Sequence, residues 1–375
     1  MAATGRKLRI GLIFGGRSAE HEVSLASAVA VMAHLDSDKY EIIPIGITKA
    51  GSWLPGVAPT ELLALEQCVR DGHKQEQYSV TNLNDSHSPR HLVFVPSEKR
   101  LATDEVLDVA FPVLHGTYGE DGTLQGLLEI ADVPYVGCGV LGSVLGMDKE
   151  KMKIIFRSAG LLVIDSLTYW RQSWERSPKV IMDTVEQRLG YPCFVKPVNL
   201  GSSIGVSKAH NCSELEQAID LAAEYDSKII IEHAINCREF ACSVLGNYEP
   251  MASVVGEVIV NNEFYDYQAK YLDNRSSTVV PAEIPQTLSD KIRCQAIQAF
   301  LALDLCGLAR MDFFLENETG QIYINEVNTL PSFTPQCMYP RLCEVSGLPY
   351  SLLLERLIEL AIERHADRRR NRTSL

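Results

Sequence analysis

The sequence contains no long apolar run and no excess of basic residues. No hydrophobic stretch reaches the ~18–20 consecutive apolar residues that a membrane-spanning helix needs. Residues 1–7 lead directly into a predicted strand, without the apolar core of a signal peptide. The formal net charge is −13, opposite in sign to the basic surface that binds nucleic-acid phosphates. We therefore expect a cytoplasmic protein with no nucleic-acid or membrane partner.

The cysteines lack the arrangement typical of a metal or disulfide site. There are ten, but no two of them form a C-x-x-C pair, and most stand in apolar segments. Cysteines in such segments are small core residues more often than metal ligands. We expect them to be reduced, and we do not expect a zinc enzyme.

A P-loop is missing, although one segment has the composition of a phosphate-binding loop. The spacing G-x-x-x-x-G-K-[ST] does not occur. Instead the predicted strand 193–197, which carries Lys196, is followed by a glycine- and serine-rich loop at 201–205. Such a loop can surround phosphate with N–H and hydroxyl groups, and the lysine adds a positive charge. A simple hairpin explains the loop alone equally well, but the lysine favours phosphate.

The chain does contain a β-α-β unit at its start. Its elements are two strands and the helix between them, at 8–14, 40–47 and 20–35. Later strands at 106–114 and 135–137 complete an open, largely parallel α/β sheet. We interpret the polar stretch 53–100 as an insertion or long surface loop. At 375 residues the chain exceeds the size of one hydrophobic core, so we expect two or three domains.

Two apolar strands near the C-terminal end carry polar groups at every second position. Arg310 and Asp312 lie in one strand, Glu326 and Asn328 in the other, and the turn 316–320 joins them. Because side chains alternate along a strand, each pair shares a face, and a hairpin brings the pairs together. Carboxylate and amide oxygens are ligands that Mg²⁺ takes together with phosphates. The alternative is a structural ion pair of Arg310 in a half-exposed sheet.

Two loops follow strands of the predicted parallel sheet at its carboxyl edge, where ligands bind in such folds. One precedes Glu20, in the first turn of a helix, and the other begins at His115. Glu20 either caps the helix dipole or projects into a cleft to hold a substrate ammonium. A single histidine is usually structural, but two loops at one edge favour a site. The aromatic-rich segment 264–271 is interpreted as a lid.

In their order along the chain, these segments resemble the D-alanine–D-alanine ligases of the ATP-grasp superfamily. The likeness extends from Gly11 to about Leu360 and is weakest across the insertion. The motifs that carry it are Gly15-Gly16-x-Ser18-Ala19-Glu20-His21-Glu22-Val23-Ser24, Leu114-His115-Gly116, Gly119-Glu120-Asp121-Gly122-Thr123-Leu124-Gln125-Gly126, Met147-Asp148-Lys149, Val195-Lys196-Pro197, Gly201-Ser202-Ser203-x-Gly205-Val206, Tyr265-Asp266-Tyr267-x-Ala269-Lys270-Tyr271, Arg310-x-Asp312 and Asn325-Glu326-Val327-Asn328-Thr329-x-Pro331.

The resemblance implies a fold and a set of ligand contacts. The fold is α/β, and α+β in the ATP-grasp part, with an N-terminal open parallel sheet at 1–145, a central ATP-grasp domain at 146–240 and a C-terminal domain at 241–375. The implied ATP contacts are Lys149, Lys196 and Lys270 at the phosphates, Ser203 in the glycine-serine loop, Glu232 at the adenine amino group beside the backbone of His233 to Ile235, Phe264 on the base and Glu239 at the ribose. Two Mg²⁺ ions, or Mn²⁺ in their place, are implied at Asp312, Glu326 and Asn328.

The implied chemistry is activation of a carboxylate by ATP. The γ-phosphoryl group moves to the carboxylate of a first D-alanine, and the amine of a second D-alanine displaces phosphate from the acyl phosphate. The implied roles are Glu20 at the first ammonium, His115 as a substrate contact, Ser202 with Tyr271 closing the lid, Arg310 and a backbone N–H near Ser332 at the oxyanion, and Cys337 and Met338 at the second substrate.

Two residues depart from the family pattern and leave the second substrate open. Ser332 stands where the family usually has glycine, so a positive φ there would add strain of about 1 kcal/mol or more. Cys337 stands where many relatives have a serine, and a thiol is the weaker donor. D-serine is therefore the alternative second substrate, because a pocket rejects an added hydroxyl weakly. The Ala269-Lys270-Tyr271 sequence favours an amine nucleophile over D-lactate.

A hypothesis from another class is a nucleotide-binding protein that has lost ligation. The chain keeps every charged group that the family chemistry implies, which argues against it. Ligases of this type are commonly homodimers, and we expect a homodimer here.

Overall fold

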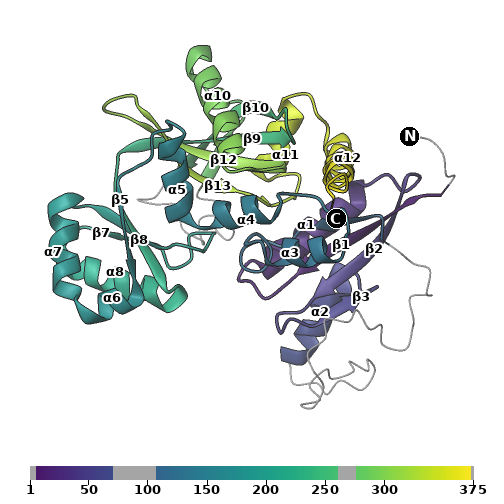
Figure 1. Cartoon of the computed structure of the whole chain (residues 1–375), viewed down its shortest axis with the longest axis horizontal. Coiled ribbons are helices and arrows are strands. Elements are labelled where there is room, and N and C mark those ends of the chain that lie inside the picture. The colour runs from purple at the N-terminus through teal and green to yellow at the C-terminus, as the bar shows by residue number, and fades with distance from the viewer. Residues whose placement is uncertain (1–5, 71–106, 261–275, 373–375) are drawn as a thin grey trace.

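The computed structural model describes residues 6–70, 107–260 and 276–372. Within these ranges the strands form three sheets, which follow one another along the chain. Figure 1 shows the sheets as separate units, with the middle one at one end of the molecule and the other two adjoining each other. None of the described helices is both long enough and apolar enough to cross a membrane.

The first sheet contains the predicted β-α-β unit. Its strands, in the order β3-β2-β1-β4, are β1 (Leu8–Gly15), β2 (Tyr40–Ile47), β3 (Trp53–Pro55) and β4 (Val109–Pro112). β1 pairs in parallel with β2 and β4, while β3 is antiparallel at the edge. Helices α1 (His21–His34) and α3 (Thr123–Ile130) follow β1 and β4. The open parallel sheet is thus confirmed, with one antiparallel edge strand.

The stretch expected to be an irregular insertion begins with regular structure, so that expectation is wrong for its first part. β3 and helix α2 (Pro59–Arg70) both lie in it. Pro59 opens the helix, where its missing N–H costs nothing, and Leu62 is fully buried in the core. The helix was missed because most of its other described residues are polar or exposed. Residues 71–100 lie outside the described ranges.

The second sheet is antiparallel and covered on one face. Its strands, in the order β5-β8-β6-β7, are β5 (Ser166–Trp170), β6 (Cys193–Pro197), β7 (Ser207–Ala209) and β8 (Lys228–His233). Its helices are α6 (Arg171–Arg176), α7 (Pro178–Arg188) and α8 (Cys212–Tyr225). Val195 and Ile231 pack with α7 and α8 in one core. Because side chains alternate along a strand, Lys196 and Glu232 lie on the other face.

The third sheet carries the predicted hairpin. Its strands, in the order β11-β10-β9-β12-β13, are β9 (Cys237–Gly246), β10 (Met251–Val260), β11 (Ser276–Val279), β12 (Gly307–Glu316) and β13 (Ile322–Asn328). The helices beside it are α4 (Val140–Met147), α5 (Lys149–Ser158), α10 (Gln286–Ala302) and α11 (Met338–Val345). Met152 and Phe156 of α5 share a core with Phe300 and Ile324, so α5 packs on this sheet. β9 begins a few residues before the expected boundary at 240.

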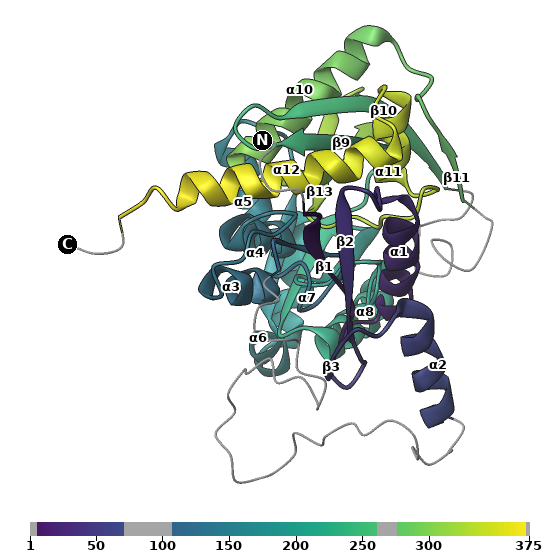
Figure 2. The ribbon, with the colours of Figure 1, turned by 90° about the vertical axis from the view of Figure 1, so that its right-hand side faces the viewer.

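The last helix joins the first and third units. α12 (Tyr350–Arg368) places Leu353 and Leu357 in one core with Leu12 of β1 and Leu308 of β12. Figure 2 shows α12 lying between the strands of these two sheets. The shared core brings the carboxyl edge of the first sheet next to the hairpin of the third.

Candidate active site

The polar face of the β12–β13 hairpin forms the floor of the candidate site. Arg310 lies opposite Asn328, and Asp312 lies opposite Glu326, in antiparallel register. A register shift follows directly after Asp312, a β-bulge of the kind often found beside functional sites. The side chains of Arg310, Asp312 and Glu326 are 24%, 21% and 25% exposed. This face is therefore half-open, whereas the sequence suggested a buried one.

Arg310 forms a bidentate ion pair with Asp312 on its own strand. Its Nε donates to Oδ1 at 2.8 Å and its NH2 group to Oδ2 at 2.7 Å, and Asn328 Nδ2 donates to Oδ2 at 3.0 Å. This is the ion pair that the sequence left as the alternative. The Arg310 guanidinium therefore contacts a predicted metal ligand, whereas the resemblance assigned Arg310 to the oxyanion.

The same residues have the donor chemistry of a Mg²⁺ site. Asp312 and Glu326 supply hard carboxylate oxygens from facing strands, and Asn328 supplies an amide beside them. No group of three or more His, Cys, Asp or Glu side chains is placed to hold a metal among the described residues. Phosphate oxygens would therefore have to complete the coordination shell, and Arg310 would have to release an oxygen of Asp312. The residues fit a cation that arrives with a nucleotide.

A buried charged cluster lies on the face of the second sheet opposite α7 and α8, where Lys153 of α5 meets Glu232 of β8. Glu232 Oε1 is 2.8 Å from Lys153 Nζ, and Oε2 is 2.6 Å from Lys196 Nζ. Burial alone would raise the pKa of Glu232, but the two ammonium groups outweigh it and hold that pKa well below its usual range. Burial likewise lowers the pKa of Lys153. In Lys196 the nearby carboxylates outweigh burial and raise the pKa.

Lys153 was not among the predicted site residues. It comes from α5, one helical turn after Lys149, and its side chain is almost fully buried. The i, i+4 spacing of the two lysines, which places them on one helix face, was the available signal. Both oxygens of Glu232 are thus already in ion pairs, so an adenine amino group would share an oxygen with a lysine.

Lys149 connects the glycine-serine loop to the hairpin. Its Nζ donates to the Leu200 carbonyl at 2.6 Å and lies 3.8 Å from Glu326 Oε2. The helix that carries it begins at Asp148, whose side chain accepts from the Lys151 N–H at 3.0 Å. A salt bridge at 2.5 Å between Asp148 and Lys228 holds this helix end against β8. The predicted phosphate lysines Lys149 and Lys196 therefore lie on firmly held elements.

Glu20 reaches across to the glycine-serine loop. Its Oε1 accepts a hydrogen bond from the Ser202 hydroxyl. Ser202 and Ser203 have φ values of 50° and 56°, a left-handed conformation that costs non-glycine residues about 1–2 kcal/mol. Gly116 has a φ of 73°, which favours glycine, and a Cβ there would lie 2.7 Å from Glu20 Oε2. Glu20 and Ser202 thus contact each other, while Tyr271, the other residue assigned to the lid with Ser202, lies outside the described residues.

His115 is buried at the boundary between the first and third units. Its Nδ1 is 2.9 Å from the Leu330 carbonyl, and its Nε2 is 3.0 Å from Ser27 Oγ. Burial lowers the pKa of His115, which favours the neutral ring. A carbonyl can only accept, so Nδ1 carries the proton and Nε2 accepts from the Ser27 hydroxyl.

Glu120, in the loop after His115, is a half-buried acid that the prediction omitted. Its carboxylate accepts from the Gly116 N–H at 2.7 Å and from the Leu330 N–H at 2.9 Å. Burial, with the nearby charge of Glu20, raises the pKa of Glu120 to about 8. The residue stands in one of the quoted family motifs, which was the signal for it.

Ser332 and Cys337 contact each other beside this boundary. The Cys337 thiol donates to Ser332 Oγ at 3.2 Å, and Ser332 Oγ is 3.4 Å from Ser27 Oγ. Ser332 is not among the described residues with positive φ, so the strain considered for serine at this position does not arise. Met338 Sδ packs beside Gly256 of β10, where a Cβ would lie 3.0 Å from it.

The remaining predicted ATP contacts lie around the connection from β8 to β9. β8 ends at His233, whose N–H donates to the Asp165 carbonyl at 3.1 Å, and Ile235 follows in the connection. Glu239 on β9 is one of the carboxylates that raise the pKa of Lys196, so Glu239 lies near the Lys196 ammonium. Phe264 and Lys270 lie outside the described residues.

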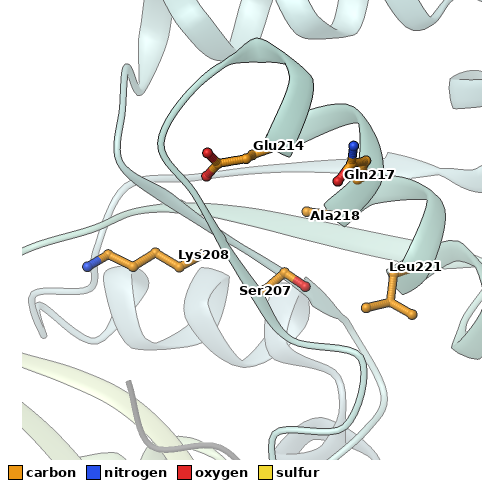
Figure 3. Close-up of a pocket in the computed structure, with 6 residues that line it drawn as sticks. All are labelled: Ser207, Lys208, Glu214, Gln217, Ala218 and Leu221. Atoms are coloured by element: carbon orange, nitrogen blue, oxygen red, sulfur yellow. The ribbon is translucent and has the colours of Figure 1, made fainter. Parts of the chain in front are cut away.

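A shallow cavity of about 290 Å³ lies elsewhere on the second unit, between β7 and α8. Figure 3 shows its lining residues, Ser207, Lys208, Glu214, Gln217, Ala218 and Leu221. None of them is a predicted site residue. The candidate site is therefore the cluster of polar groups described above.

Two family models match the chain over most of its length. The model described as D-ala D-ala ligase N-terminus matches residues 9–138, and the model described as D-ala D-ala ligase C-terminus matches residues 155–359. A D-alanine–D-alanine ligase of Chloroherpeton thalassium is 48% identical over 368 residues, covering 97% of this chain and 98% of the relative. The enzyme of that name from Acetivibrio thermocellus is 47% identical over 368 residues, with the same coverage.

Solved structures show the same similarity. The D-alanine-D-alanine ligase from Coxiella burnetii has a TM-score of 0.79 and 34% identity, covering 97% of this chain and 98% of that one. The VanG D-Ala:D-Ser ligase from Enterococcus faecalis has a TM-score of 0.77 and 36% identity, covering 95% of this chain and 100% of that one.

Proposed function

The chain belongs to the D-alanine–D-alanine ligase family, and from this premise we propose how its residues join two D-alanines. Family membership makes it an ATP-dependent, ADP-forming ligase of peptidoglycan synthesis that uses a divalent metal. The observation that carries the proposal is the position of Lys149, between the Leu200 carbonyl and Glu326 of the hairpin. Lys149 joins the proposed phosphate loop at 201–205 to the acidic floor of the hairpin, as a nucleotide held between the two sheets requires.

We propose that ATP lies between the hairpin and the face of the second sheet that carries Lys196 and Glu232. The proposed contacts are Lys149, Lys196, Lys270 and Ser203 at the phosphates, Glu232 with the backbone of His233 and Ile235 at adenine, Phe264 on the base and Glu239 at the ribose. Asp312, Glu326 and Asn328 would hold two Mg²⁺ ions, with Mn²⁺ accepted in their place. When bound, the metal neutralises charge on the transferred phosphoryl group.

The proposed reaction proceeds through an acyl phosphate. A carboxylate oxygen of the first D-alanine attacks the γ-phosphorus and ADP leaves. The amine of the second D-alanine then attacks the carbonyl carbon, and phosphate leaves as the peptide bond forms. Glu20 holds the ammonium of the first substrate, and His115 supports that subsite from the buried side, because both of its ring nitrogens are bonded to the protein. Arg310 and the Ser332 N–H stabilise the tetrahedral oxyanion. For this, the Arg310 guanidinium must turn partly away from Asp312. A cation bound at the Asp312 carboxylate would release Arg310 for that movement.

We propose that Ser202 and Tyr271 close the site over these groups. The Ser202 hydroxyl already contacts Glu20, so the glycine-serine loop links the nucleotide to the first substrate. Closure excludes water, which would otherwise hydrolyse the acyl phosphate.

D-serine is kept as the alternative second substrate. Cys337 and Met338 were assigned to that subsite, and the Cys337 thiol donates to Ser332 at 3.2 Å. The similarity to a D-Ala:D-Ser ligase structure at 36% identity supports testing it. The names of the curated relatives favour D-alanine.

We also propose three domains, at 1–145, 146–240 and 241–375, a homodimeric assembly and action in the cytoplasm, where ATP is supplied. The three sheets support the division into domains.

Phosphate release tests the proposed function. The purified chain with Mg²⁺ and ATP should release phosphate when D-alanine is added and form D-alanyl-D-alanine. A panel of second amino acids, including D-serine, is compared at equal concentration. No D-alanine-dependent release would exclude the proposal, and a marked preference for a mixed dipeptide would favour the D-serine alternative.

A further inference from the structure

We propose that Ser27, His115 and Glu120 of the first unit position the segment Leu330–Phe333 of the third, so that the Ser332 N–H meets the tetrahedral oxyanion. The proposal rests on the proposed function, which places that N–H at the reacting carbonyl. It makes the first unit part of the machinery for the second half-reaction, rather than only a holder of the first substrate.

The peptide groups of Leu330 are held from both ends. Its N–H donates to Glu120 Oε1 at 2.9 Å, and its carbonyl accepts from His115 Nδ1 at 2.9 Å. Glu120 is itself fixed, because its Oε2 accepts from the Gly116 N–H at 2.7 Å. These are buried or half-buried contacts, in which a displaced partner would leave a polar group unsatisfied.

Ser27 holds the other end of the segment. Its hydroxyl accepts from the Phe333 N–H at 3.1 Å and donates to His115 Nε2 at 3.0 Å. Ser27 lies on α1 and is fully buried. His115 is therefore shared by the two anchors, which makes Ser27, His115 and Glu120 one connected network.

The segment has one amide left over. Pro331 has no N–H, and the amides of Leu330 and Phe333 are bonded to Glu120 and Ser27. Among the described residues, the Ser332 N–H donates no hydrogen bond. An oxyanion donor is effective when it is held in place before charge develops, and anchors on both sides of Ser332 do this.

The ionisation of Glu120 couples its hydrogen bond with the Leu330 N–H to the binding of the first substrate. The charged groups around Glu120 are Glu20, before α1, and Arg310 on β12. His115, in the same loop, has a lowered pKa and is neutral. Repulsion from Glu20 disfavours the ionised form, which is the better acceptor for two N–H groups. An ammonium held at Glu20 offsets that repulsion, so the first D-alanine strengthens the anchor at Glu120.

Ser27→Ala and Glu120→Gln test the proposal, with Ser24→Ala as the matched control. Ser24 lies one turn earlier on α1, is equally buried, accepts from the Gly15 N–H at 2.7 Å and donates to the Val113 carbonyl at 2.7 Å. Ser24 thus makes the same kind of hydrogen bonds as Ser27, but both of its partners belong to the first unit. The wild type and the three variants are compared for kcat, for KM of ATP and D-alanine, and for binding of a phosphinate analogue of the dipeptide.

Ser27→Ala and Glu120→Gln should each lower kcat about 10- to 100-fold, approaching the effect of losing an oxyanion donor. Binding of the tetrahedral phosphinate should weaken by a similar factor, while KM for ATP stays within about twofold, as expected for a contact made only in the transition state. Ser24→Ala should lower the melting temperature without these kinetic changes.

Two outcomes would overturn the proposal. In one, both test variants keep the kcat and phosphinate affinity of Ser24→Ala. In the other, kcat falls but phosphinate affinity does not. Failure of the wild-type chain to make dipeptide would instead reject the proposed function, and this inference with it.

Discussion

At the scale of single residues, the site depends on charges that are buried together. Glu232, Lys153 and Lys196 carry a net charge of +1 within a few ångströms of one another. Removing one partner of a buried ion pair is costly because it leaves the other uncompensated. The size of the net charge left behind therefore decides how severe each substitution is.

Glu232→Gln should destabilise the protein strongly, by about 3–5 kcal/mol, because it leaves two buried ammonium groups without a counter-charge. Lys153→Met is the matched variant, since it leaves the neutral pair Glu232–Lys196. Urea unfolding should rank Glu232→Gln as clearly the less stable of the two. Equal losses would show that the cluster is solvated and that its charge balance is unimportant.

Glu120 should make stability depend on pH. Its pKa is raised to about 8 in the folded chain, against about 4.3 when unfolded. A group that binds its proton more tightly when folded adds stability below its unfolded pKa, and that contribution is lost as the pH rises toward 8. As the pH is raised from about 4.5 to 8, the denaturation midpoint of the wild type should therefore decrease more than that of Glu120→Gln. Parallel profiles for the two proteins would contradict the raised pKa.

At the scale of elements, strand alternation and helix ends place the functional groups. The β12–β13 register alone brings Asp312 opposite Glu326. The start of α5 places Lys149 between the Leu200 carbonyl and Glu326, and this helix end is held by Asp148. A substitution at the cap of α5 should therefore displace Lys149 and weaken ATP binding.

Asp148→Ala should cost about 1 kcal/mol or more and raise KM for ATP, because it removes both the cap and the partner of Lys228. Asp148→Asn keeps a cap acceptor but loses the charge, so it should lie between Asp148→Ala and the wild type in both stability and KM. Calorimetry and ATP-dependent kinetics measure the two effects. An unchanged KM in Asp148→Ala would mean that Lys149 does not depend on this helix end.

At the scale of the whole molecule, the first and third units share one core while the second has its own. Leu357 of α12 belongs to the shared core with Leu12 and Leu308, and Leu215 of α8 belongs to the core of the second unit. The site lies where these units meet. Its geometry therefore depends on how α12 and α5 hold them together.

Leu357→Ala and Leu215→Ala should separate the two cores in a melting experiment. Each is fully or almost fully buried, so each truncation should cost about 2–5 kcal/mol. Leu357→Ala should lower the transition of the first and third units together, and Leu215→Ala that of the second. Hydrogen exchange of α8 and β1 follows the two cores separately. Loss of protection in both elements from either variant would show a single cooperative unit.

Much of the site followed from local pattern. The polar face of the hairpin needs only the alternation of side chains, and β6 with Lys196 needs only an apolar strand before a glycine-serine loop. Helix α2 was missed because its apolar residues do not form one regular helical stripe: Leu62 is buried, whereas its neighbour Leu63 is exposed. The ion pair of Arg310 with Asp312 was left open, because a sequence does not show which carboxylate a long side chain will choose.

The sequence by itself determined the family, the order of the elements and the chemical type of nearly every group in the site, because these depend on residue identity and on short-range periodicity. Only the tertiary structure decided which groups meet. Lys153 with Glu232 and His115 with Leu330 are contacts between residues far apart in the chain. Such pairs arise from the packing of α5 on the third sheet and of the first unit against the third. Packing of that kind depends on the whole core, so no local segment of the sequence specifies it.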